Sequence, residues 1–267
     1  MTAAPAATPR PELVALDIDG TLVGPDGVVP PPVVAAVRRV RAAGAHVVLA
    51  TGRTFLGTRP VAEQLGLDSG WLVCSNGAVT ATLEPPEFVD VVTFDPEPAV
   101  RLLLEHRPDA LVAVERLGEG HYVTEPFPEG ELTGEQVVVP LDVLVALPAT
   151  RVVLRCPDSD AERLLELVER IGLHEVTYAV GYTAWLDLAP QGVTKASALE
   201  EVRRRLGVAR EATVAVGDGR NDVEMLAWAG CGVAMGQAAL EVRERADVVT
   251  EPFADDGLAV ALGWWFA

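Results

Sequence analysis

Short apolar runs, each followed by polar and glycine residues, recur along the first third of the chain. They lie at residues 13–18, 46–50 and 71–74. Runs of this length that are apolar almost throughout are typical of strands buried on both faces of a parallel sheet. Segments with apolar residues at helical spacing separate them, at residues 30–43 and 55–65. This alternation of strands and helices predicts parallel βαβ units with short loops.

The same alternation returns near the C-terminus. We therefore predict one α/β core formed by residues 1–83 and 184–267, a Rossmann-like parallel sheet with helices on both faces. In its second part, helices are predicted at residues 195–206, 222–229 and 240–246, and strands at residues 213–216 and 231–234.

The middle of the chain has a different pattern and a different charge. Residues 84–135 hold 13 acidic residues against three arginines and no lysine. Two helices are predicted here, at residues 97–106 and 160–171, among short apolar runs. We predict that residues 84–183 form a separate α/β insert whose acidic residues lie on a solvated face.

Composition excludes several classes of function. The 267 residues include 39 acidic and 21 basic ones, a net charge of −18, which disfavours binding to nucleic acids and to anionic membranes. No apolar run reaches the roughly 18 residues of a membrane-spanning helix. Residues 1–11 lack the apolar region of a secretory signal and are read as a tail. The cysteines Cys74, Cys156 and Cys231 are far apart, which favours reduced thiols in a cytoplasmic protein. No oligomeric state is predicted.

Polar side chains follow the predicted strands at the edge where ligands bind in open parallel sheets. Asp17 and Asp19 follow the first strand, Thr51 the second, and Asp218 and Asp222 the strand near the C-terminus. Carboxylates that converge without partners would repel one another. A hard divalent cation such as Mg²⁺, which takes oxygen ligands, resolves this repulsion.

The pair Asp17 and Asp19 suits covalent catalysis at phosphorus. One carboxylate can attack as a nucleophile while the other moves a proton. Mg²⁺ lowers the repulsion between a carboxylate and a phosphate group. Lys195, at the start of a predicted helix, and the Thr51 hydroxyl would bind the remaining phosphate oxygens.

These segments resemble the four motifs of the haloacid dehalogenase superfamily phosphatases. The run Asp-Ile-Asp-Gly-Thr-Leu at residues 17–22 matches the first motif, and residues 51–53, Lys195 and residues 217–222 match the others in order. The resemblance covers residues 12–262. The insert between the second and third motifs is similar in position and size to the α/β cap of the Cof-type subgroup.

The resemblance implies a role for each matching residue. Asp17 would be the nucleophile that forms an aspartyl-phosphate, and Asp19 the proton donor and then the base. Asp17, the carbonyl of Asp19, and Asp218 would hold Mg²⁺. Asp222 would orient Lys195 or a metal-bound water. The phosphate would be held by the Ile18 and Gly52 amides, Thr51, Lys195 and Asn221.

Three points stay open at this level. Arg53 either binds the substrate phosphate or pairs with a surface acid. The insert would close over the leaving group and select the substrate, and cap arginines such as Arg116 or Arg155 could offset its acidity locally. Gln237 stands where asparagine is more common in the subgroup, and no role is assigned to it.

The sequence thus predicts a Mg²⁺-dependent phosphatase, a phosphoric monoester hydrolase that acts on a small phosphate ester. A sugar phosphate is the first expectation, with flavin mononucleotide or a nucleotide next. A phosphomutase or phosphonate hydrolase on the same scaffold, or a non-enzymatic metabolite-binding protein, are the alternatives. A dinucleotide-binding protein is disfavoured, because no G-x-G-x-x-G follows the first strand.

Overall fold

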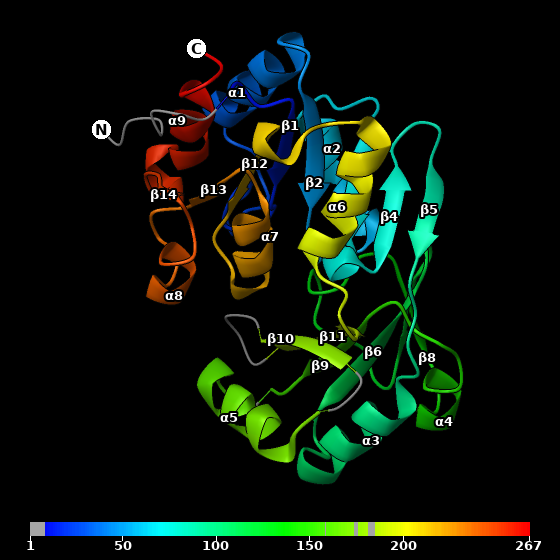
Figure 1. Cartoon of the computed structure of the whole chain (residues 1–267). Helices are drawn as coiled ribbons and strands as arrows, with labels where there is room; N and C mark the ends of the chain where they lie inside the picture. The colour runs from blue at the N-terminus through cyan, green and yellow to red at the C-terminus, as the bar shows by residue number, and fades with distance from the viewer. Residues whose placement is uncertain (1–8, 158, 174–175, 181–184) are drawn as a thin grey trace.

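The structure is a computed structural model that describes residues 9–157, 159–173, 176–180 and 185–267. Most of the predicted N-terminal tail, residues 1–8, lies outside the described residues. The chain forms two sheets with their helices, one above the other in Figure 1. The two ends of the chain build the upper part, and the middle of the chain builds the lower part.

The larger sheet has eight strands in the order β14-β13-β12-β1-β2-β3-β4-β5. Strands from β14 to β3 pair in parallel, whereas β4 and β5 are antiparallel additions at one edge. The strands are β1 (Leu13–Leu16), β2 (His46–Ala50), β3 (Trp71–Cys74), β4 (Val79–Thr82), β5 (Glu87–Val91), β12 (Thr213–Gly217), β13 (Cys231–Ala234) and β14 (Val248–Val249).

Helices cover both faces of this sheet, because successive side chains of a strand point to opposite sides. Leu13 and Ala15 of β1 pack in the apolar cluster of α6, α7 and α8. Val14 and Leu16 pack in the cluster of α1, α2 and α9. The predicted Rossmann-like core is thus confirmed. The helices are α1 (Pro31–Ala42), α2 (Phe55–Gln64), α6 (Lys195–Leu206), α7 (Val223–Trp228), α8 (Leu240–Arg243) and α9 (Gly257–Gly263).

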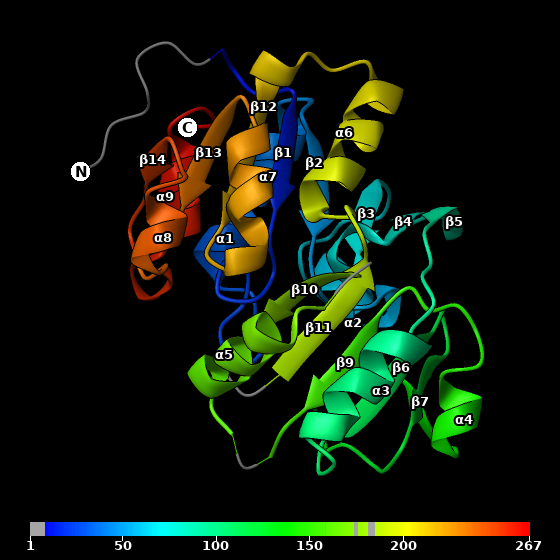
Figure 2. The same cartoon turned by 60° about the horizontal axis from the view of Figure 1, so that its bottom comes forward.

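The smaller sheet has six strands in the order β10-β11-β9-β6-β7-β8. Helices α3 and α5 cover the face of this sheet that is turned away from the larger sheet. The other face is turned toward the larger sheet (Figures 1 and 2). We call this part the cap. Its elements are β6 (Leu111–Arg116), β7 (Gly120–Val123), β8 (Glu135–Val138), β9 (Val152–Arg155), β10 (Val176–Val180), β11 (Trp185–Pro190), α3 (Glu97–His106), α4 (Leu141–Leu144) and α5 (Ala161–Ile171).

The strand pairing differs from the predicted boundaries of the insert at residues 84 and 183. β5 lies beyond residue 84 but pairs with β4 in the larger sheet. β11 lies beyond residue 183 but pairs with β9 and β10 in the cap. The strand that each of them pairs with sets the sheet to which it belongs, and the local hydrophobic pattern does not identify that partner. The chain therefore passes between the sheets after Val91 and after Pro190.

Three smaller expectations can be compared with the structure. The helix predicted at residues 240–246 ends at Arg243. No described helix is long and apolar enough to cross a membrane. All three cysteines are buried.

A buried histidine of the cap makes stability depend on pH. His121 in β7 is 1% exposed, and burial, followed by the nearby charge of Arg151, lowers its pKa from 6.5 to about 4. Between these two values the unfolded chain is protonated at His121 and the folded chain is not. The free energy of unfolding therefore falls as the pH drops from 6.5 toward 4.

The wild type loses stability between pH 7 and pH 4.5. We expect this loss to be smaller by about 2–3 kcal/mol in His121→Leu. Urea denaturation of both proteins at the two pH values measures this difference. His106→Leu, an exposed substitution at the end of α3, is the control for replacing a histidine by leucine. Equal losses of stability in the wild type and His121→Leu would contradict the prediction.

Candidate active site

The carboxyl ends of β1, β2, β3 and β12 meet at the edge of the larger sheet that faces the cap (Figure 1). Asp17 follows β1, Thr51 follows β2, Asn76 follows β3 and Asp218 follows β12. Asp17, Thr51 and Asp218 are almost fully buried. Asp17 and Asp218, which are 201 positions apart in the sequence, therefore lie in one site, as the order of strands and helices predicted.

Lys195 lies at the centre of this site and has no exposed side-chain surface. It is the only lysine in the sequence. Its Nζ donates to Asp17 Oδ1 at 2.7 Å and to Asp222 Oδ1 at 2.6 Å. Lys195 is held here as the first residue of α6, whose start is fixed by a capping box between Thr194 and Ser197.

Asp222 links Lys195 to the turn after β12. Its second oxygen, Oδ2, accepts from the amide of Asp218 at 3.0 Å and from that of Gly219 at 2.9 Å. The turn fits closely around this carboxylate, since a Cβ atom at Gly217 would lie 2.5 Å from Asp222 Cγ. Asp222 therefore positions both Lys195 and the loop that carries Asp218.

Burial and neighbouring charges shift the pKa values of Asp17, Asp218 and Lys195. Burial raises the pKa of Asp17 well above its ordinary value, and the charges of Asp222 and Asp218 add to this, whereas Lys195 opposes it. Burial and the charge of Asp222 raise the pKa of Asp218 to about 6. Burial alone would lower the pKa of Lys195, but Asp17 and Asp222 together outweigh it and raise this pKa. The cluster therefore has more negative charge than Lys195 neutralises.

This donor set fits a divalent cation. One oxygen each of Asp17, Asp218 and Asp222 can be chosen so that all three lie within 4.8 Å of one another. Both oxygens of Asp222 already accept hydrogen bonds from Lys195 and the two amides. Asp17 and Asp218 are therefore the carboxylates better suited to a hard cation such as Mg²⁺.

Gln237 is a site residue that the sequence did not reveal. Its Nε2 donates to the carbonyl of Gly20 at 2.7 Å and to Asp218 Oδ2 at 3.2 Å. Its Oε1 accepts from the amide of Phe253 at 2.9 Å. Gln237 thus holds Asp218 against the first motif, where Gly20 has a φ of 82° and no room for a Cβ atom. No motif spacing pointed to this role.

Asp19 does not join the buried cluster. Its carboxylate is exposed and accepts two hydrogen bonds from Arg53, at 2.9 Å from Nε and 2.6 Å from Nη2. Arg53 therefore pairs with an acid in this structure, but that acid is itself a predicted site residue. The ion pair joins the first motif to the second.

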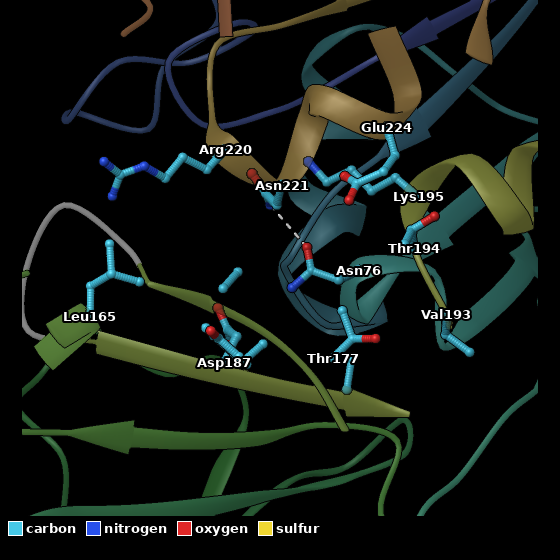
Figure 3. Close-up of a pocket in the computed structure, with 13 residues that line it drawn as sticks. Asn76, Leu165, Thr177, Asp187, Val193, Thr194, Lys195, Arg220, Asn221 and Glu224 are labelled. Carbon is cyan, nitrogen blue, oxygen red and sulfur yellow. Dashed lines mark hydrogen bonds between the residues drawn. The ribbon is translucent and has the colours of Figure 1, made fainter. Parts of the chain in front are cut away.

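The loops after β2 and β3 form a connected group of polar atoms. The Thr51 carbonyl accepts from the Asn76 amide at 3.0 Å, and the Thr51 hydroxyl accepts from the Arg53 amide at 3.1 Å. Asn221 donates through Nδ2 to Asn76 Oδ1 at 2.9 Å (Figure 3). Ile18 is fully buried, with its side chain in the same apolar cluster as Val14 and Leu16.

A cavity of about 140 Å³ separates this group from the cap. In Figure 3, Asn76, Lys195 and Asn221 lie on its core side, opposite Thr177 and Asp187 of the cap. A second cavity of about 270 Å³ is also lined by Asp187 and Asn221, and it reaches Asp218. The two cavities connect the buried cluster to the cap.

The cap also contacts the core through a buried glutamate. Ser75 Oγ of the core donates to Glu115 Oε2 at 2.6 Å, and Thr150 Oγ1 of the cap donates to the same atom at 2.8 Å. The two cap arginines singled out from the sequence do not line the cavities. Arg116 pairs with Glu119 and Glu135, and Arg155 pairs with Glu131.

Known proteins with similar sequences or folds point to one family. Over residues 14–262 the sequence matches the family of haloacid dehalogenase-like hydrolases. It is 29% identical over 257 residues to the 5-amino-6-(5-phospho-D-ribitylamino)uracil phosphatase YcsE of Bacillus subtilis, with 95% of each chain covered. It is 32% identical over 238 residues to the HMP-PP phosphatase of Serratia proteamaculans, with 86% of each chain covered. A solved phosphatase of the haloalkanoate (HAD) enzyme superfamily from Bacteroides thetaiotaomicron superposes with a TM-score of 0.77 at 25% identity, over 98% of this chain and 99% of that one.

Proposed function

The chain belongs to the haloacid dehalogenase-like hydrolase family, and we propose that it is a Mg²⁺-dependent phosphatase of a small phosphorylated metabolite. The observation that carries this proposal is the buried contact of Asp17 with Lys195, beside Asp218, at the end of a cavity. At this sheet edge Lys195 can bind a phosphate ester, and Asp17 can attack its phosphorus.

In the proposed reaction, Asp17 attacks phosphorus, the bond between phosphorus and the leaving oxygen breaks, and an aspartyl-phosphate forms. Lys195 binds a phosphate oxygen and reduces the repulsion that Asp17 would meet. When bound between Asp17, Asp218 and the Asp19 carbonyl, Mg²⁺ would neutralise charge on the phosphate group. Asp222 keeps Lys195 in place through its 2.6 Å contact.

Asp19 is proposed to move the protons. It gives a proton to the leaving oxygen and later takes one from the water that hydrolyses the intermediate. In this structure Arg53 holds its carboxylate at the exposed rim. Substrate binding would let Arg53 pair with the phosphate, which would release Asp19 for the leaving oxygen. Thr51, Asn221 and the Ile18 and Gly52 amides would bind the other phosphate oxygens.

The relatives support the reaction more strongly than a particular substrate. The names of the two curated relatives both say phosphatase, but they give different substrates. We propose a sugar phosphate first and flavin mononucleotide or another nucleotide next. A phosphomutase would use the same two acids but return the phosphoryl group to the substrate. The buried cysteines are compatible with the proposed cytoplasmic location.

We expect the purified protein to release phosphate from p-nitrophenyl phosphate with Mg²⁺, and to lose at least about nine tenths of this activity with a chelator. Restored activity after excess Mg²⁺ is the control for protein damage. A panel of phosphorylated metabolites then identifies the substrate. Activity that the chelator leaves unchanged would contradict the proposed metal, and an isomeric phosphate ester without free phosphate would favour the mutase.

A further inference from the structure

The face of the cap that is turned toward the core holds a partly buried ion pair. Leu186 and Leu188 of β11 pack in the apolar cluster of α3 and α5. Asp187, between them, therefore points to the opposite face. There Arg151, which precedes β9, donates through Nε to Asp187 Oδ1 at 2.6 Å. The side chains of Arg151 and Asp187 are only 10% and 16% exposed.

Asp187 borders both cavities between the cap and the core. Figure 3 shows its carboxylate on the cap side of the cavity, facing the side on which Asn221 and Asn76 lie. A phosphate group held by the core would place the rest of its ester in this space. Asp187 is therefore a cap residue in position to contact the leaving group.

The ion pair makes a carboxylate compatible with an anionic substrate. An unpaired carboxylate in this cavity would repel a phosphate ester, but the Arg151 guanidinium neutralises the charge of Asp187. Among side chains of the described residues, only Arg151 donates to Asp187, and it uses Oδ1. Oδ2 can thus accept a hydrogen bond from a bound molecule.

The other charges at the cavities favour a neutral leaving group. Glu224 lines the first cavity and Glu162 lines the second. Arg220, which lines both, is paired with Glu241. A second phosphate or carboxylate on the leaving group would face these acids, whereas a hydroxyl group can donate a hydrogen bond to Asp187.

We propose that Asp187, held by Arg151, determines specificity by accepting a hydrogen bond from a hydroxyl group of a neutral, polyhydroxylated leaving group. This inference rests on the proposed phosphatase function and assigns the specificity to one carboxylate of the cap. Asp187 contacts the substrate but not the reacting atoms. Substitution of Asp187 should therefore lower kcat/KM for esters that carry hydroxyl groups and leave kcat/KM unchanged for esters that carry none.

The test compares Asp187→Asn with the wild type on ribose 5-phosphate, glucose 6-phosphate and p-nitrophenyl phosphate. Asparagine keeps an oxygen for Arg151 but replaces the other acceptor by an NH₂ donor. We expect kcat/KM for the better sugar phosphate to fall about 10- to 100-fold, while p-nitrophenyl phosphate changes less than about threefold. Asp142→Asn is the matched control, an exposed cap aspartate that also pairs with an arginine, Arg101, and it should match the wild type on all three esters.

Equal losses on all three esters, or no loss on any, would overturn the assignment of Asp187. A wild type that hydrolyses p-nitrophenyl phosphate but neither sugar phosphate would also overturn it. A wild type that hydrolyses none of a broad panel of phosphate esters would instead refute the proposed function. Thermal unfolding of each variant shows that a loss is not due to misfolding.

Discussion

Asp17→Asn is expected to lower kcat by about 10⁴-fold or more, because the amide cannot form the aspartyl-phosphate. The substitution preserves the size of the side chain and keeps an oxygen that can accept from Lys195, which donates to Asp17 Oδ1 at 2.7 Å. Phosphate release from p-nitrophenyl phosphate with saturating Mg²⁺ measures the loss. The variant should remain folded, since one buried negative charge is removed from a cluster that holds an excess of them.

Asp26→Asn is the matched control for this experiment. Asp26 is an exposed aspartate in the same loop, and its Oδ1 accepts from the amide of Val28 at 3.1 Å. Asparagine can keep that bond, so the activity should stay within about twofold of the wild type. If Asp17→Asn keeps more than about a hundredth of the wild-type kcat, Asp17 is not the nucleophile. A beryllium fluoride complex that binds the wild type but not Asp17→Asn would support the acyl-phosphate directly.

Lys195→Met should remove both activity and stability. The substitution leaves Asp17 and Asp222 facing each other without the cation that now lies 2.7 Å and 2.6 Å from them. Breaking a buried ion pair from one side costs about 3–5 kcal/mol. We expect a loss of this size in the free energy of unfolding at pH 8, and a loss of kcat of about 10³-fold. Urea denaturation without added Mg²⁺ is the measurement, because a bound cation could replace the lost charge.

The pH dependence of this loss distinguishes a charge effect from a packing effect. Lys195 opposes the raised pKa of Asp17, so without Lys195 this pKa rises further in the folded state, and the folded chain binds a proton that the unfolded chain releases. The variant should therefore be less destabilised at pH 5 than at pH 8. The double variant with Asp222→Asn should recover part of the stability at pH 8. A loss that is equal at both pH values would indicate lost packing instead.

The single lysine also gives a direct view of the site. Because Lys195 is the only lysine in the chain, labelling with ¹⁵N-lysine yields one Nζ signal in the folded protein. The charges of Asp17 and Asp222 hold its pKa above the ordinary value of 10.5. We expect the signal in the wild type to remain mainly that of an ammonium group at pH 10.5, where an ordinary lysine is half deprotonated.

The sequence by itself determined the core and most of the site. Buried parallel strands are continuous apolar runs, so β1, β2, β3 and β12 are visible locally. Each run ends directly before polar residues of the proposed site, such as Asp17, Thr51 and Asp218. Parallel strands bring their carboxyl ends to one edge, which is why local patterns sufficed to predict that these residues meet.

Only the tertiary structure decided which residues complete the site. Gln237 reaches Asp218 from a loop after β13, and Asp187 meets Arg151 across paired strands. Neither contact has a sequence spacing that identifies it, because the partners are set by the packing of distant elements. The same holds for β5 and β11, whose place in one sheet or the other depends on the strand beside each of them. A hydrophobic pattern shows that a strand is buried, but its neighbour is chosen by the fold as a whole.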